Sequence, residues 1–435
     1  MKSPDTSFRY RVSQMFAHAD LIRSRVPAVS KWYIRRFRQS QLEAARRLRD
    51  KDCIEVAFFL TVPGMWKSDY LFRAMRDNPR YHPYIVIYPY SQYKGFSDKE
   101  IETTLRRTEK FVAEKGFEYV IPYDGKRHKW LDVKKSLDPD VVVFSDPYKD
   151  CLPRYFIYHF RDRLTCYIPY SLTILRLYRE NYNIMSINLM GLFCLETPMH
   201  RELALKYMRN GAENAVVTGY PGTEVFLDPS YKPKDPWKPQ PVVKKRIIWA
   251  PHHSIDDEVS ISTFLIYYDD MLKLAEKYAD RVQFAFKPHQ LLKFKLQHIW
   301  GAERTERYYR RWDELGNGQL EEASYVNLFL TSDAMIHDSA SFTTEYLYTH
   351  KPVMYLVRNE RQSDVLSPFG QLVYDVHYHG HSIEEIEHFI NETVLGGDDP
   401  KATERQEVFD KYLQPVDGMM PSERIIYEIE KLINS

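Results

Sequence analysis

Residues 332–356 constrain the fold of this chain more than any other part of the sequence. After Ser332 and Asp333 comes a short apolar run, AMIH, that is typical of a buried strand. Asp338 ends this run, and Ser339 and Ser341 are residue types that commonly begin a helix. Lys351-Pro352 ends the helical stretch before a second apolar run resumes. The segment therefore predicts a strand, a turn, a helix and a second strand, as in a parallel α/β sheet.

The turn in this segment has the chemistry of a phosphate-binding site. A helix that begins between Ser339 and Ser341 directs backbone N–H groups and the positive end of its dipole beyond the strand. Glu345 follows Ser341 by four residues, so both project from one helix face. Hydroxyls, amides and a carboxylate suit the phosphates and ribose of a nucleotide. A well-capped crossover helix in an ordinary parallel sheet explains the same residues equally well.

Short apolar runs alternate with helical stretches along most of the chain, which predicts parallel sheets covered by helices. Residues 228–241 contain five prolines and predict a stiff linker. We expect a basic helical extension at 1–50, a Rossmann-like domain at 51–229, a linker at 230–241 and a second Rossmann-like domain at 242–435. Two such domains facing each other across a cleft form the GT-B architecture, which does not decide what group is transferred.

The apolar runs predict strands in both domains. In the first domain the expected strands are 53–60, 84–88, 119–122, 141–144, 166–168, 187–195 and 215–218. In the second domain they are 246–250, 282–286, 334–337 and 353–357. The last three expected helices are 382–393, 405–413 and 422–433, and the final helix is expected to cross back to the first domain.

The N-terminal segment is strongly basic although the whole chain has a net charge of only +1. Residues 1–50 contain 12 Lys and Arg against 4 Asp and Glu, interleaved with aromatic and aliphatic residues. Such a helix can lie on an anionic membrane surface, or it can pack on the body of the protein as an extra helix. We expect no nucleic-acid partner, because no recognition module follows the basic segment.

Four cysteines without C-x-x-C spacing indicate reduced core thiols rather than a disulfide or zinc framework. No apolar run approaches 18 residues, and the N-terminus lacks the apolar core of a signal peptide. We therefore expect a cytoplasmic protein that is peripheral on the inner face of the cell membrane if the basic segment contacts lipid.

Two further loops are expected at strand ends in the second domain. His252 and His253, in APHHSI, follow the strand 246–250 and are candidates for phosphate contact or proton transfer. Lys287 and His289, in KPHQ, follow the strand 282–286 and can touch one ligand together. A solvent-facing loop and a structural turn are the alternatives for these two motifs.

His377, His379 and His381 alternate at strand spacing and could line one side of an extended segment. No cysteine or repeated carboxylate completes a metal site there, so a polar loop is the favoured interpretation. The sequence predicts neither a metal nor a cofactor.

The ordered motifs resemble those of the CDP-glycerol glycerophosphotransferases of teichoic acid and capsule synthesis. The similarity covers residues 214–427. Each motif alone is weak evidence for the family, and the similarity depends on their order. The motifs that resemble the family pattern are Thr218-Gly219-Tyr220-Pro221, Ala250-Pro251-His252, Lys287-Pro288-His289-Gln290, Ser332-Asp333 through Asp338, Ala340 and Ser341, Asp417-Gly418 and Ser422-Glu423-Arg424.

The resemblance implies a GT-B enzyme, peripheral on the membrane, that transfers a polyol phosphate from a CDP-activated donor to a hydroxyl of a polymer or lipid-linked acceptor and releases CMP. It implies that Lys287, Ser341 and neighbouring amides, with Asp338 and Ser339 in the same turn, hold the diphosphate. His289 would contact the transferred or leaving phosphate, and Glu345 would bind the ribose.

One departure from the family pattern affects the expected chemistry. The family has a W-H-G-T-P-x-K segment whose histidine resembles the acceptor-activating base, but residues 167–173, YIPYSLT, contain no histidine. Either His252 or His253 then supplies the base, or the transferred group differs. The alternatives are a GT-B glycosyltransferase that uses a nucleotide sugar, and a non-catalytic membrane-bound partner of other polymer enzymes.

Overall fold

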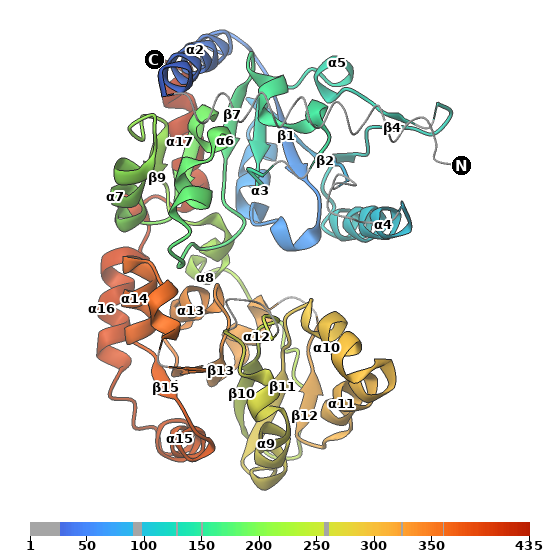
Figure 1. Cartoon of the computed structure of the whole chain (residues 1–435), viewed down its shortest axis with the longest axis vertical. Coiled ribbons are helices and arrows are strands. Elements are labelled where there is room, and N and C mark those ends of the chain that lie inside the picture. The colour runs from blue at the N-terminus through green and yellow to red at the C-terminus, as the bar shows by residue number, and fades with distance from the viewer. Residues whose placement is uncertain are drawn as a thin grey trace. The chain divides into compact units, whose positions relative to one another are not determined.

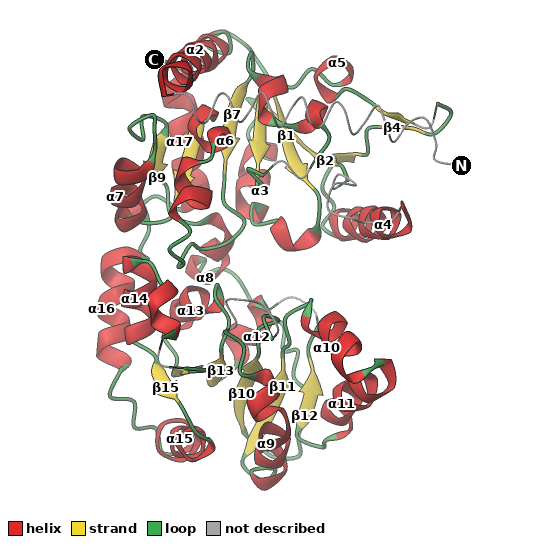
Figure 2. Ribbon diagram, in the orientation of Figure 1, coloured by secondary structure: helices red, strands yellow, loops and turns green. Residues whose placement is uncertain are grey.

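The computed structural model describes residues 27–89, 98–127, 129–148, 151–255, 261–322, 325–359 and 361–435. The chain divides into two compact units, each built on a parallel sheet (Figures 1 and 2). Unit 1 is formed by Met1–Ser171, Leu177–Glu224 and Pro415–Ser435, and unit 2 by Leu172–Arg176 and Val225–Gln414. The proline-rich stretch, expected as a linker between the domains, lies in unit 2, and the last helix lies in unit 1, as its expected crossing back to the first domain implies.

The sheet of unit 1 has seven strands in the order β3-β2-β1-β6-β7-β8-β9, and all its strand pairs are parallel. Most of its strands are runs of buried Val, Ile, Phe and Leu, as a sheet covered on both faces requires. The strands are β1 (Ile54–Leu60), β2 (Tyr81–Ile87), β3 (Tyr119–Val120), β6 (Val141–Phe144), β7 (Leu164–Tyr167), β8 (Leu192–Leu195) and β9 (Ala215–Val217). The longer helices are α2 (Pro27–Arg46), α3 (Asp69–Arg76), α4 (Asp98–Glu114), α7 (Pro198–Tyr207) and α17 (Pro421–Ile433).

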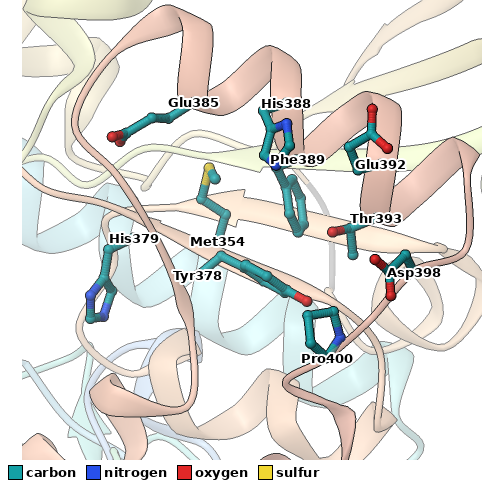
Figure 3. Close-up of a pocket in the computed structure, with 10 residues that line it drawn as sticks. All are labelled: Met354, Tyr378, His379, Glu385, His388, Phe389, Glu392, Thr393, Asp398 and Pro400. Atoms are coloured by element: carbon teal, nitrogen blue, oxygen red, sulfur yellow. The ribbon is translucent and has the colours of Figure 1, made fainter.

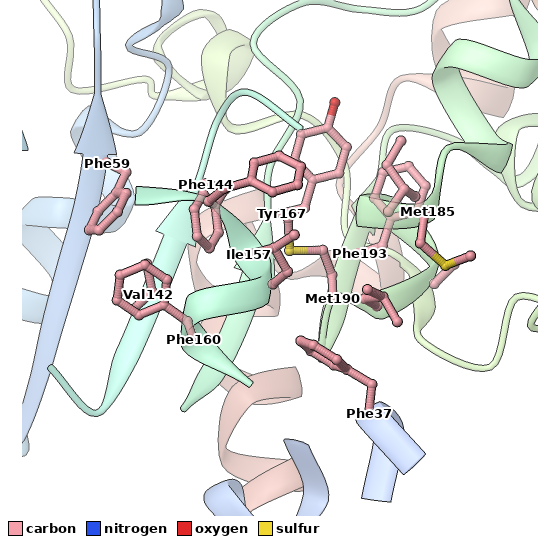
Figure 4. Close-up of a cluster of buried hydrophobic side chains, with 14 of the residues drawn as sticks. Phe37, Phe59, Val142, Phe144, Ile157, Phe160, Tyr167, Met185, Met190 and Phe193 are labelled. Atoms are coloured by element: carbon pink, nitrogen blue, oxygen red, sulfur yellow. The ribbon is translucent and has the colours of Figure 1, made fainter. Parts of the chain in front are cut away.

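Helix α2, the described part of the basic segment, packs on unit 1 through one face. Phe37 is fully buried and belongs to the same apolar cluster as Phe160 and Met190 (Figure 4). The Gln41 side-chain oxygen accepts hydrogen bonds from the backbone N–H and the hydroxyl of Thr165 at 2.8 and 2.9 Å. The packing alternative is therefore confirmed for this face of the helix. No helix in the described part of the chain is long and apolar enough to span a bilayer.

Helix α17 returns to the sheet of unit 1, as expected from the sequence. Its Ile425, Ile429 and Ile433 are fully buried in the cluster that also contains strand β1. Ser422, in the first turn of the helix, donates from its backbone N–H and its hydroxyl to the buried carboxylate of Glu224 at 2.9 and 2.5 Å. A carboxylate at a helix N-terminus is stabilised by the helix dipole, so this contact fixes where the chain returns.

The sheet of unit 2 has six parallel strands in the order β12-β11-β10-β13-β14-β15. The strands are β10 (Lys245–Ala250), β11 (Val282–Phe286), β12 (Gly318–Leu320), β13 (Ala334–His337), β14 (Val353–Leu356) and β15 (Tyr378–Gly380). The longer helices are α9 (Phe264–Lys277), α10 (Leu292–Trp300), α11 (Ala302–Glu314), α14 (Pro368–Asp375) and α16 (Ala402–Tyr412). Trp249, Phe286 and Trp312 pack against one another in its core.

Several expected elements differ from the structure. The predicted strand 187–195 is helix α6 (Met185–Leu189) followed by β8, because a short apolar run does not distinguish a buried helix from a strand. The predicted polar loop around His379 is the edge strand β15. The helix expected after Ser341 is α13 (Phe342–Glu345), one turn that continues as the 3-10 helix η7 (Tyr346–Thr349).

The segment Leu172–Arg176 belongs to unit 2 although the residues on either side belong to unit 1. The Arg176 N–H donates to the Val365 carbonyl at 2.8 Å, and the Ser367 N–H donates to the Ile174 carbonyl at 2.7 Å. Gly370 lies against this segment, and a Cβ at this position would be 2.1 Å from the Ile174 oxygen. Gly370 is therefore required by close backbone approach.

We expect Gly370→Ala to lower the free energy of unfolding by about 1–3 kcal/mol, because the added methyl group forces the segment away from helix α14. Gly316→Ala is the matched control, since a Cβ there meets nothing within 4 Å. Equilibrium urea unfolding of the two variants measures the difference. Equal stability of both variants would show that the segment moves aside at no cost.

Candidate functional site

Three loops meet at the carboxyl end of the sheet in unit 2. Strand β10 lies between β11 and β13, and each of the three strands is followed by one of the motifs expected from the sequence. From β10 the chain runs outward through β11 and β12 and then crosses to β13 on the other side of β10, so the strand order reverses between β10 and β13, and this point is the topological switch point of the sheet. Open parallel sheets bind ligands outside the carboxyl ends of their strands at such points.

Backbone hydrogen bonds join the loops after β10 and β11 beyond the end of the sheet. The Lys287 N–H donates to the Trp249 carbonyl at 2.8 Å, and the His289 N–H donates to the Pro251 carbonyl at 3.0 Å. These bonds continue the β10–β11 ladder past its last registered pair, Trp249 with Phe286. These two hydrogen bonds hold the loop that carries Lys287 and His289 beside the loop that carries His252 and His253.

Asp338 ties the loop after β10 to strand β13. Its side chain is fully buried, and its carboxylate accepts hydrogen bonds from the backbone N–H of His252, the backbone N–H of Thr263 and the Thr263 hydroxyl. Burial raises the pKa of Asp338 to about 6, and these hydrogen bonds oppose the shift. Because both carboxylate oxygens face donors of the protein, Asp338 is positioned to hold the loop rather than to contact a phosphate directly.

His252, His253 and His289 form a compact cluster of imidazoles. Their ring centroids are separated by 4.3 Å between His252 and His253, 4.3 Å between His253 and His289, and 5.2 Å between His252 and His289. Burial lowers the pKa of His252 to about 2 and that of His289 to about 3. Both rings are therefore neutral at physiological pH.

Backbone amides favour one tautomer in each of two of these rings. The Nδ1 atom of His252 accepts from the Ser254 N–H at 3.2 Å, and that of His289 accepts from the Leu291 N–H at 3.1 Å. A neutral imidazole whose Nδ1 accepts a hydrogen bond carries its proton on Nε2. His252 and His289 thus have Nε2–H groups as hydrogen-bond donors.

Lys287 is the buried cation of the site. Its side chain is 8% exposed, and burial lowers its pKa to about 8 while Glu321 and Glu322 oppose the shift. A pKa of about 8 keeps most of the amine protonated at neutral pH. A cation in such surroundings interacts with a bound anion more strongly than one in water does.

The turn after β13 is less like a capped helix than the sequence predicted. Ser341 has helical dihedral angles and makes no side-chain capping bond, and α13 has only four residues. Ser339 is buried and Ser341 is partly exposed. Glu345 is 1% exposed and hydrogen-bonded to Tyr325, so a contact between Glu345 and a ribose stays a prediction.

Two buried imidazoles lie beneath this turn. His337 and His377 have no exposed surface, and their ring centroids are 5.4 Å apart. The Nδ1 of His377 donates to the Val373 carbonyl at 2.7 Å, whereas the Nδ1 of His337 accepts from the Ser339 N–H at 3.1 Å. Burial lowers the pKa of His337 to about 3 and that of His377 well below its usual value.

We expect this pair to make the protein acid-labile. In the unfolded chain both rings take up a proton near pH 6.5, whereas in the folded chain they stay neutral, so stability is lost as the pH falls below about 6.5. At pH 5 each ring lowers the free energy of unfolding by about 2 kcal/mol, and the raised pKa of Asp338 offsets part of this loss. The loss between pH 7.5 and 5 should be about 2 kcal/mol smaller in His377→Gln, as urea unfolding at both pH values measures. An equal loss in both proteins would contradict the assignment.

The other candidate histidines do not gather into a site. The Nε2 of His379 contacts the Tyr374 carbonyl at 3.0 Å, and its ring stacks on Tyr374. A cavity of about 210 Å³ lies beside this strand, with Met354, Tyr378 and Phe389 among its apolar lining residues (Figure 3). The side chains of the three loops described above are not part of its lining.

Comparison with solved structures identifies the fold. A putative UDP-N-acetylglucosamine 2-epimerase from Listeria monocytogenes has a TM-score of 0.57 and 14% identity, over 88% of this chain and 97% of that chain. A variant of the wall teichoic acid polymerase TagF has a TM-score of 0.55 and 11% identity, over 98% of this chain and 99% of that chain. A TagF variant soaked with CDPG has a TM-score of 0.52 and 14% identity, over 93% of this chain and 96% of that chain. These similarities show the fold alone and confirm the predicted GT-B class.

A family model gives the more specific assignment. The model of the CDP-glycerol:poly(glycerophosphate) glycerophosphotransferases matches residues 192–431, which include every motif of the candidate site. The chain therefore belongs to this family, and the predicted enzyme class, a transferase that uses CDP-glycerol to transfer a polyol phosphate, is confirmed. No curated protein matches the sequence.

The sequence indicated that the loops carrying His252, Lys287 and Asp338 would lie together, and the structure brings them to one sheet edge. It did not reveal that Asp338 bonds to Thr263, because Thr263 belongs to no motif and approaches only through the fold. The two amide contacts that favour these imidazole tautomers were also missed, since they depend on local backbone geometry.

Proposed function

We propose that the three loops at the carboxyl end of the unit 2 sheet bind the diphosphate of CDP-glycerol and that the enzyme transfers glycerol phosphate from it. The observation that carries this proposal is the meeting of APHHSI, KPHQ and the β13 turn at one topological switch point, within the segment that matches the family. The distal phosphorus is attacked by an acceptor hydroxyl, its bond to the bridging oxygen breaks, and CMP leaves.

The roles of the side chains follow from their protonation states. Lys287 provides a buried positive charge for the diphosphate. His252 and His289 donate from Nε2–H to phosphoryl oxygens, and such fixed donors stabilise the charge that develops in phosphoryl transfer. A ring that carries its proton on Nε2 cannot accept another at that atom. His253 is therefore our candidate for the base that takes the proton of the acceptor hydroxyl, in place of the histidine missing from residues 167–173.

The acceptor is proposed to be a hydroxyl of a cell-surface polymer of the teichoic acid type or of its lipid-linked precursor. The similarity of the chain to a wall teichoic acid polymerase supports this class of acceptor. We further propose that the outer face of α2 contacts an anionic membrane, because Trp32 is 58% exposed and Arg36 lies over its ring. Flotation of the full chain with anionic and with neutral vesicles tests this contact.

The donor is identified by incubating the purified protein with CDP-glycerol, CDP-ribitol and UDP-N-acetylglucosamine, with and without a glycerol-phosphate primer. We expect CMP to be released from CDP-glycerol only when the primer is present. ³¹P NMR measures this release. Release of UDP would instead support the nucleotide-sugar alternative. Absence of turnover and binding with every nucleotide would refute the proposal and support a non-catalytic partner.

The proposed base is tested by separating kcat from KM. We expect His253→Gln to lower kcat with little change in KM, because the base acts in the chemical step. We expect His252→Gln to retain more activity than His253→Gln, since an amide replaces an N–H donor but not a base. The reverse order would assign the base to His252.

A further inference from the structure

The histidine cluster has a geometry that the proposed phosphate contacts do not require. One ring nitrogen from each of His252, His253 and His289 lies within 4.8 Å of the other two. Tetrahedral zinc with nitrogen ligands at 2.0–2.1 Å separates those nitrogens by about 3.4 Å. The three nitrogens must therefore approach one another by at most about 1.4 Å to share one ion.

The backbone that carries these rings is already fixed. The His252 N–H bonds to Asp338, the His289 N–H bonds to the Pro251 carbonyl at 3.0 Å, and the Ile255 N–H bonds to the His253 carbonyl at 2.9 Å. Metal binding would thus order side chains on backbone that these hydrogen bonds already hold in place at the three histidines. A preorganised ligand set of this kind lowers the entropy lost on binding.

Ser254 is placed to orient the ring of His252, one of the three ligands. The Ser254 hydroxyl lies 2.9 Å from Nδ1 of His252 and accepts a hydrogen bond from the Ile261 N–H at 3.1 Å. Metal binding therefore changes the tautomer of His252: its Nδ1–H then donates to the Ser254 hydroxyl instead of accepting from the Ser254 N–H, which leaves the Nε2 lone pair for an ion. Coordination through Nε2 of His289 costs its contact with the Leu291 amide, but this contact is exposed and water can replace it.

From this arrangement we propose that His252, His253 and His289 form a binding site for a divalent transition-metal ion of the zinc class. Imidazole ligands favour Zn²⁺, Ni²⁺ and Cu²⁺ over Mg²⁺ and Ca²⁺, which prefer oxygen. Three protein ligands leave a fourth position for water or an oxyanion. The site uses side chains of the proposed donor site but does not depend on that function, because the ion binds without nucleotide.

The proposal is tested by calorimetric titration of the tag-free, EDTA-dialysed full chain with ZnCl₂ and MgCl₂. We expect one Zn²⁺ per chain and no binding of Mg²⁺. His253→Gln and His289→Gln should each weaken Zn²⁺ binding roughly 100-fold or more, since loss of a ligand exceeds the 10–100-fold effect of losing a ligand's supporting contact. Circular dichroism confirms that each variant is folded.

His298→Gln is the matched control, because His298 is exposed on helix α10 and its ring contacts only the Phe294 side chain and carbonyl among the contacts described. It should bind Zn²⁺ as the unmodified chain does. X-ray absorption of the zinc-loaded protein should show nitrogen and oxygen neighbours. Sulfur neighbours, undiminished affinity in both cluster variants, or no uptake of Zn²⁺ would each overturn the proposal.

Discussion

Lys287→Met is expected to lower kcat/KM for CDP-glycerol by roughly 10²–10³-fold. The side chain is 8% exposed and protonated at neutral pH, because its lowered pKa of about 8 still lies above 7. A positive charge in buried surroundings stabilises the charge of a transferring phosphate more than an exposed lysine can. Methionine retains the length and apolar stem of the side chain, so the substitution removes the charge with little change in packing.

Lys293→Met is the matched control for this prediction. Lys293 is on helix α10, close in sequence to the KPHQ loop, but its amine pairs with Glu306 at 3.0 Å and lies over the Tyr309 ring. Loss of such a partly exposed pair changes stability by at most about 1 kcal/mol and should leave kcat/KM unchanged. Steady-state kinetics of both variants decides the question, and equal activity of the two would remove Lys287 from the donor site.

The elements that the sequence located best are strands whose burial is continuous. Residues 141–144, 282–286 and 334–337 were expected as strands and are β6, β11 and β13 with the same ends. Each is an apolar run between polar residues, and local pattern alone defines it. By contrast, β15 contains His379 and Gly380, and only pairing with β14 makes it a strand.

The candidate site shows the same division between local and tertiary information. Motif order, together with the rule that parallel strands end at one sheet edge, was enough to infer that His252, His289 and Asp338 follow adjacent strands. The role of each side chain at this edge could not be inferred from the sequence. Asp338, for example, is turned toward protein donors by contacts with residues 75 and 86 positions away in sequence. The buried environment that lowers the imidazole pKa values is likewise a property of packing.

Asp338→Ala is expected to lower the free energy of unfolding by roughly 3–5 kcal/mol, because it leaves the amides of His252 and Thr263 without their acceptor. Hydrogen bonds to a carboxylate are among the strong ones, and Asp338 accepts three of them. The substitution also releases the loop that carries the histidine cluster. We therefore expect kcat/KM to fall at least about tenfold in conditions where the variant is folded.

Asp333→Ala separates the effect on stability from the effect on the site. Asp333 immediately precedes β13, whereas Asp338 immediately follows it. The Asp333 carboxylate accepts a hydrogen bond from the Arg246 N–H at 2.9 Å, at the opposite end of the β10–β13 pair. It should destabilise the protein while leaving kcat/KM unchanged, because no residue of the candidate site depends on it. Urea unfolding and steady-state kinetics on both variants distinguish the roles. A folded Asp338→Ala variant with the kcat/KM of Asp333→Ala would show that this carboxylate does not position the catalytic loop.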